Sequence, residues 1–210
     1  MGTTTLLDMI GSVMIFGFLL LAVLHLNAGA SQNNYAYNQN YLLQRNMVVL
    51  TVMLEDDLKH VGAGVYDDYG GVQNADTADL LFRAVLPGST AIRTVEWRLE
   101  TTGPPADNPN IRYLDRIVDG VTQRMNLGVT QFAFQYWSVY DANTPLPVPM
   151  NSATVPNPCG NIGPISVSIR LESPYKEIGN YMDSTDVSLY DMVWRQIRSI
   201  SRNNTIQFPQ

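Results

Sequence analysis

Few side chains in this chain are suited to hydrolytic chemistry. A thiol or hydroxyl nucleophile needs a base to activate it and a third group to orient that base. Cys159 is the only cysteine, and His60 is the only histidine outside the apolar stretch near the N-terminus. A Cys159–His60 dyad requires a fold that joins the two residues, whereas a histidine near a helix end is usually solvated. We therefore expect no catalytic residue and no enzymatic activity.

A group of acids could instead ligate a metal. Oxygen ligands of the kind that Ca²⁺ prefers are offered by Asp67, Asp68, Asp76 and Asp79, with Asn74 nearby. Their spacing matches no EF-hand loop. Solvated loop acids are the simpler interpretation, so we expect neither a metal nor any other cofactor.

Charge and cysteine content restrict the partners. The chain has 19 acidic and 13 basic residues, for a net charge of −6. A nucleic-acid-binding surface needs clustered Lys and Arg, so we expect no nucleic acid partner. One cysteine can form neither an intrachain disulfide nor a zinc site built from cysteines. Asn203-Asn204-Thr205 fits a glycosylation sequon, which is a pattern of low specificity.

Asp8 has the most informative position of the charged residues. No other Lys, Arg, Asp or Glu occurs before Arg45, and an apolar run follows Asp8 directly. An ionised carboxylate at the edge of a membrane segment is costly unless it is paired or reaches the interface. Two interpretations stay open. Asp8 lies in the headgroup region or caps a helix N-terminus, or it neutralises the α-amino group of an adjacent subunit during assembly.

The run that follows Asp8 is apolar enough to cross a membrane. Residues 9–26 read MIGSVMIFGFLLLAVLHL and contain no Lys, Arg, Asp or Glu. About twenty such residues span a bilayer core as a helix, so we predict a transmembrane helix over residues 4–26. A secretory signal peptide is the alternative, because AGA at 28–30 resembles a cleavage site, but no basic residue precedes the run.

The helix is predicted to continue past the membrane. Apolar residues recur at steps of four and three and so lie on one stripe: Leu43, Met47, Leu50, Leu54, Leu58 and Val61. The stripe makes residues 40–61 amphipathic and needs a head domain to cover it. No proline occurs before Pro87, and Gly62 and Gly64 supply a stop. We predict one unbroken helix over residues 4–60, about 85 Å long, as the core of a first region, 1–62.

The second region, 63–210, has the pattern of an antiparallel sheet. Short alternating runs between Gly, Pro, Asn and Asp predict strands over 79–86, 92–101, 111–118, 121–126, 129–139, 164–171 and 192–200. Asp119-Gly120 is a strong hairpin signal between two of these strands. The predicted fold class is therefore α+β, with a long N-terminal helix packed on an antiparallel head.

One predicted strand has a strongly aromatic face. Phe132, Phe134 and Tyr136 alternate with Gln131 and Gln135, and Val129 falls on the Gln face in a regular strand. We expect the aromatic face to pack on the helix stripe. The Pro-rich residues 141–163 are unsuited to a central strand, so we expect an exposed loop there.

Three local sequences resemble those of the type IV pilin superfamily. TTLLD at 4–8 is similar to the family's hydrophobic start, with Asp8 in the place of its acid. LEDDLKHVGAG at 54–64 resembles the turn that ends the helix in J-type type II secretion pseudopilins and W-type minor pilins. VTQFAFQYW at 129–137 resembles their aromatic central strand. The chain departs from the family pattern in having no basic residue before the matched run and no proline within the apolar segment.

The resemblance implies a structural protein. It implies a subunit that inserts in the cytoplasmic membrane and then assembles, through its apolar helix, with copies of itself or with other pilin-like subunits. The product is a surface, extracellular or periplasmic filament with the β head outward. A minor subunit at a filament tip is an alternative within the family. A membrane-anchored binding module that uses the Pro-rich loop and never polymerises is an alternative from another class.

Overall fold

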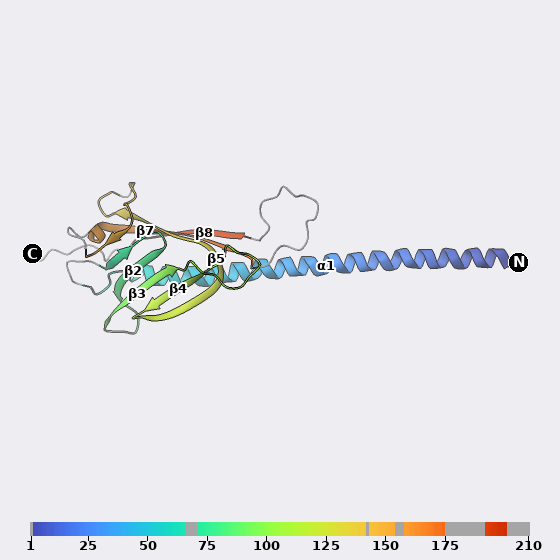
Figure 1. Cartoon of the computed structure of the whole chain (residues 1–210), viewed down its shortest axis with the longest axis horizontal. Helices are drawn as coiled ribbons and strands as arrows, with labels where there is room; N and C mark the ends of the chain where they lie inside the picture. The colour runs from blue at the N-terminus through green and yellow to red at the C-terminus, as the bar shows by residue number, and fades with distance from the viewer. Residues whose placement is uncertain (1, 66–70, 142, 154–157, 175–191, 201–210) are drawn as a thin grey trace, which may run out of the picture.

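The computed structural model describes residues 2–65, 71–141, 143–153, 158–174 and 192–200. One α-helix and one β-sheet are the main elements of this part of the chain (Figure 1). The predictions that concern Asp67, Asp68 and the sequon at Asn203 lie outside the described residues.

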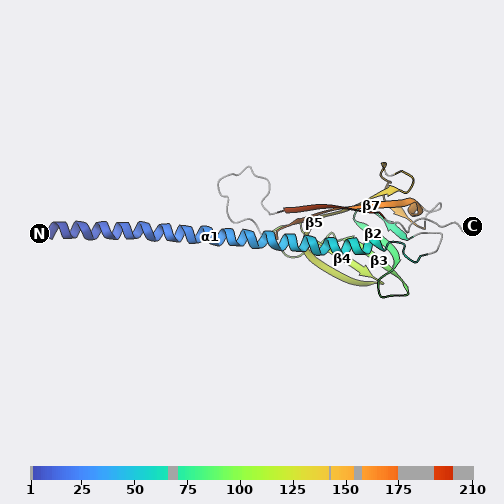
Figure 2. The same ribbon diagram turned by 180° about the vertical axis from the view of Figure 1, so that it is seen from behind.

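The helix α1 (Gly2–Lys59) runs without a break for 58 residues. The predicted continuity is thus confirmed, with the end one residue earlier than expected. Neither Gly29 nor the Asn-rich residues around it interrupt the helix, because no proline removes a backbone donor there. The first half of α1 projects away from the rest of the molecule (Figures 1 and 2).

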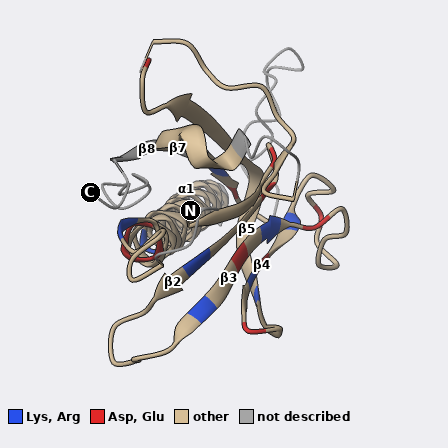
Figure 3. Cartoon of the chain, turned by 90° about the vertical axis from the view of Figure 1, so that its left-hand side faces the viewer, with Lys and Arg blue, Asp and Glu red and all other residues tan. Residues whose placement is uncertain are grey.

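The sheet contains eight antiparallel strands, in the order β6-β1-β2-β3-β4-β5-β7-β8. Their bounds are β1 (Val72–Ala75), β2 (Asp79–Val85), β3 (Ile92–Leu99), β4 (Arg112–Val118), β5 (Val121–Ser138), β6 (Met150–Asn151), β7 (Ile162–Glu172) and β8 (Met192–Ile200). Viewed along α1, the sheet curves around the helix (Figure 3). The predicted α+β class, a long apolar helix with an antiparallel sheet, is confirmed.

The sequence predicted two strands over residues 121–126 and 129–139, whereas the structure has one strand, β5, in their place. It is continuous from Val121 to Ser138, and it pairs with β4 in its first part and with β7 in its second part. The pairing shifts on both sides of the change, and Asn126, Leu127 and Gly128 together lie opposite one residue of β4, Tyr113. This bulge bends the strand. A second irregularity lies in the pairing with β7, where Val129 is opposite Leu171 and Gln131 is opposite Arg170, so that Thr130 is an extra residue. This extra residue reverses the alternation between Val129 and Phe132 and both are buried, so the predicted position of Val129 on the Gln face was wrong.

The hairpin predicted between β4 and β5 is present. Asp119 and Gly120 both have positive φ, at 50° and 80°, as a type I′ turn requires. The Arg93 guanidinium also donates to the Asp119 carboxylate at 2.9 Å, which ties the turn to β3.

The Pro-rich residues 141–163 are only partly the exposed loop that the sequence predicted. They contain the short strand β6, which pairs with β1, and a 3₁₀ turn, η1 (Pro158–Asn161). Met150, Cys159 and Ile162 are buried. Neither β1 nor β6 was predicted, because strands of four and two residues are too short to display a period.

Candidate functional site

The N-terminal half of α1 is the most unusual surface of the described molecule. Its large apolar side chains between Leu7 and Leu26 are all exposed, from 49% for Leu20 to 72% for Met9. Its most apolar 18-residue window has a mean hydropathy of 2.4. The helix is therefore long and apolar enough to cross a membrane, and it has no covering within the described chain.

Asp8 lies inside this apolar segment. Since α1 begins at Gly2, Asp8 is beyond the first turn, and its carboxylate is not at the position of an N-cap. The described hydrogen bond at Asp8 involves its backbone: the Ser12 hydroxyl donates to the Asp8 carbonyl at 2.8 Å. Within α1 as described, Asp8 is therefore not an N-cap, and the proposals below concern the headgroup and subunit-pairing interpretations.

The second half of α1 is held by the sheet. The predicted stripe and the predicted aromatic face lie in one buried cluster, with no member more than 4% exposed: Leu43, Met47, Leu50, Leu54, Leu58, Val61, Phe132, Phe134 and Tyr136. The rings of Phe132 and Phe134 meet edge to face with their centroids 4.9 Å apart, and the Trp97 and Phe132 ring centroids are 6.2 Å apart. Apolar burial of this extent is the main force that keeps the helix on its head.

A buried ion pair adds a directional link between helix and sheet. Both oxygens of Asp57 on α1 accept from the Arg116 guanidinium on β4, at 2.6 and 2.7 Å. Oδ2 also accepts the indole N–H of Trp97 on β3 at 2.8 Å. The hydrogen bond that Arg116 donates to Asp57 is the main cause of the raised pKa of Arg116. This bidentate geometry favours one position of α1 along its axis and one rotation about that axis, relative to the sheet.

Sequence reasoning missed this link. In the sequence Asp57 is simply one residue of the LEDDLKHVGAG segment, and in the structure it lies between the exposed Asp56 and the buried Leu58. The helical phase gives the one available signal, because Asp57 lies between the buried Leu54 and Val61 on the inner face. Its partners are 40 and 59 residues away in sequence, so they could not be identified from local pattern.

The turn after α1 is bound to β2 by backbone hydrogen bonds. The Gly62 N–H donates to the Arg83 carbonyl at 3.0 Å, and the Val85 N–H donates to the Ala63 carbonyl at 2.8 Å. A Cβ on Gly71 would lie 2.2 Å from the Gly62 Cα. The turn therefore depends on two glycines packing backbone to backbone.

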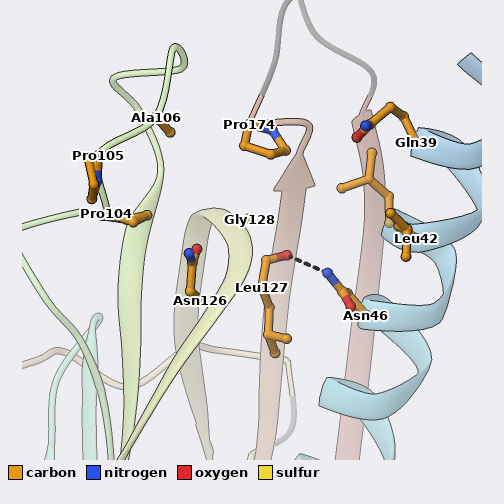
Figure 4. A pocket seen from close by; sticks show the side chains of 11 residues that line it. Gln39, Leu42, Asn46, Pro104, Pro105, Ala106, Asn126, Leu127, Gly128 and Pro174 are labelled. Carbon is orange, nitrogen blue, oxygen red and sulfur yellow. Dashed lines mark hydrogen bonds between the residues drawn. The ribbon is translucent and has the colours of Figure 1, made fainter. Parts of the chain in front are cut away.

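A small groove lies where α1 leaves the head (Figure 4). The Asn46 side-chain amide donates to the Leu127 carbonyl at 3.3 Å and closes one wall. The cavity volume is about 260 Å³, and its eleven lining residues carry no charge: Gln39, Leu42, Leu43, Asn46, Pro104, Pro105, Ala106, Asn126, Leu127, Gly128 and Pro174. With few polar groups and no titratable side chain, the groove lacks the means for acid–base chemistry.

Of the acidic cluster considered as a metal site, the structure describes Asp76, Asp79 and the nearby Asn74, and these three do not form a metal site. The Asn74 amide donates to Asp79 Oδ2 at 3.2 Å, and burial together with Glu96 raises the pKa of Asp79. Asp76 accepts the Thr77 N–H at 2.6 Å and its carbonyl accepts the Tyr136 hydroxyl at 2.9 Å. Among the described residues, no three His, Cys, Asp or Glu side chains converge as metal ligands would.

The two candidate catalytic residues have separate environments. Cys159 is buried with Sγ 3.9 Å from the Gln73 carbonyl, and burial raises the pKa of its thiol to about 11. A nucleophilic cysteine needs the opposite shift. The His60 ring is at the end of α1, with Nδ1 2.6 Å from the Asp56 carbonyl.

Comparison with protein-family models, with characterised proteins and with solved structures gave no match for this chain.

Proposed function

We propose that this chain is the structural subunit of a filament of the type IV pilus or pseudopilus kind, inserted in a membrane through α1 before assembly. The observation that carries the proposal is the single helix whose first half is exposed and apolar on every side while its second half is fixed in a β head. An all-round apolar helix requires lipid or other apolar helices as its surroundings.

The length of the uncharged stretch favours assembly over simple anchoring. No Lys, Arg, Asp or Glu lies between Asp8 and Arg45, a distance of about 55 Å along the helix. A bilayer core is about 30 Å thick. A membrane anchor needs no such excess, whereas a bundle of parallel helices buries its whole length.

The fixed attachment of the head also supports the proposal. A binding module on a membrane tether works with any linker, but a subunit that is repeated in a filament must present its head at one defined angle to its helix. The Asp57–Arg116–Trp97 contacts and the apolar stripe supply that angle.

The decisive experiment combines imaging with a change at Asp8. Surface appendages or membrane-derived filaments from the native cell should contain this chain, with α1 in the filament core. Asp8→Ala should block or slow filament formation, because the variant has no carboxylate at position 8 to form a charge pair within the helix bundle. Membrane insertion and head folding should stay unchanged. Asp8→Glu should be partly tolerated, since it keeps the charge and adds one methylene.

Normal numbers and lengths of filaments from Asp8→Ala cells would show that the carboxylate has no part in assembly. Cells in which the chain stays in the membrane as single copies, with no filament that contains it, would favour the anchored binding module.

A further inference from the structure

The docked half of α1 has a second apolar face, directed away from the sheet. Tyr41, Val48 and Val52 follow one another at helical steps on the side opposite the buried stripe. They are 57%, 55% and 60% exposed, and Val49 beside them is 45% exposed. No part of the described chain covers this face, which we call the outer stripe: Tyr41, Arg45, Val48, Val49 and Val52.

A bilayer cannot cover the outer stripe when residues 9–26 are in the membrane. Val48 is 22 positions beyond Leu26, so it stands about 33 Å further along the helix. The head surrounds this part of α1 on the other side (Figure 2). Any covering of the outer stripe would therefore be a protein surface.

The charges identify that surface. Asp8 and Arg45 are the only charged side chains from residue 2 to residue 54. Both are exposed, and neither has an ion-pair partner among the described residues. An ion buried among apolar helices is stable only beside a counter-ion. An apolar segment with one anion thus complements an apolar stripe with one cation.

We propose that the outer stripe binds the N-terminal apolar segment of a second copy, with the Asp8 carboxylate of one copy paired to the Arg45 guanidinium of the other. The proposal rests on the function proposed above and specifies the register of its helices. Asp8 and Arg45 are 37 positions apart, so two parallel copies are displaced by about 55 Å.

The same displacement gives a close fit between the two helices. Counting from the Asp8–Arg45 pair, Gly11 lies level with Val48, Ser12 with Val49 and Ile15 with Val52. Small residues opposite branched ones allow helices to approach closely. A Cβ built on Gly11 meets no atom within 4 Å, so the approach is open. The head does not obstruct it, because the first half of α1 is free of the sheet (Figure 1).

Cysteine cross-linking of the full chain in its native membrane and filament fractions tests the register. Ser12→Cys with Val49→Cys places two thiols about 55 Å apart in one copy, so only neighbouring copies can form the disulfide. We expect a ladder of oligomers longer than dimers on oxidation. Ser12→Cys with Lys59→Cys is the matched control, because Lys59 is on the same side of α1 but about 15 Å further on. Because the native Cys159 is buried, the single Ser12→Cys and Val49→Cys variants each offer one accessible thiol and can give dimers at most.

Charge reversal tests the pairing within the cross-linking background. Arg45→Glu should reduce the ladder by at least about tenfold, and Asp8→Arg in the same chain should restore it to within about twofold. Lys59→Glu should leave it unchanged. Failure of the double variant to recover, or an unaffected ladder in Arg45→Glu, would assign the Asp8 partner to another cation such as the α-amino group and overturn the pairing.

The remaining outcomes separate this inference from the proposed function. Normal filaments that link through the 12/59 pair, or through neither pair, overturn the register alone. Absence of both filaments and linked oligomers from the unsubstituted chain overturns the proposed function and the register with it.

Discussion

The buried link between α1 and the sheet gives the sharpest stability prediction. Asp57→Ala removes a carboxylate that accepts two hydrogen bonds from Arg116 and one from the Trp97 indole. It leaves a guanidinium whose side chain is only 20% exposed, and a buried N–H, without their acceptor.

Breaking a buried pair by removing one partner costs about 3–5 kcal/mol. Partial access of water to Arg116 favours the lower end, so we expect a loss of about 3 kcal/mol. With a urea m-value of about 2 kcal/mol/M, the unfolding midpoint should fall by about 1.5 M. The assay is urea unfolding of the detergent-solubilised full chain, followed by tryptophan fluorescence, to which the buried Trp97 contributes.

Asp56→Ala is the matched control, because Asp56 is the exposed neighbour of Asp57 on the same helix. It should change the free energy of unfolding by no more than about 0.5 kcal/mol. In a double-mutant cycle, Arg116→Ala should add little once Asp57 is already Ala. If Asp57→Ala were no more harmful than Asp56→Ala, the head would be held by apolar packing alone and the argument for a fixed angle would lose its main support.

Three further predictions concern the head. Gly128→Ala should destabilise it by about 1–3 kcal/mol, because a Cβ there lies 2.6 Å from the Glu172 carbonyl at a φ of 81°; thermal unfolding measures this, and an unchanged midpoint contradicts it. The Arg124 hydrogen bonds lower the pKa of Asp115, so its contribution to stability is complete above the ordinary carboxyl pKa of about 3.9 and is lost as the pH falls through the lowered value; Asp115→Asn should flatten the acid side of a stability–pH curve. A fragment beginning at Ser31 should be monomeric in light scattering at micromolar concentration, since it lacks the apolar segment, whereas stable oligomers would indicate assembly through the heads.

Local pattern was sufficient for the features whose cause is local. The absence of proline before Pro87 and the spacing from Leu43 to Val61 determined a continuous helix and its buried side, because both depend on residues within one or two turns. Asp119-Gly120 determined a hairpin for the same reason, since the turn needs positive φ at its own two residues.

The tertiary structure alone decided the features that depend on distant segments. Asp57 became a buried link because the chain brings β3 and β4 against the end of α1. One strand, β5, replaced two predicted strands because it pairs with β4 and β7 in succession, and the extra residue Thr130 in its pairing with β7 turned Val129 inward. Pairing of β6 with β1 buried Met150 in a segment whose prolines had indicated an exposed loop. Each of these outcomes depends on which strands meet after the loops between them have closed, and neighbouring residues carry no periodic signal of that.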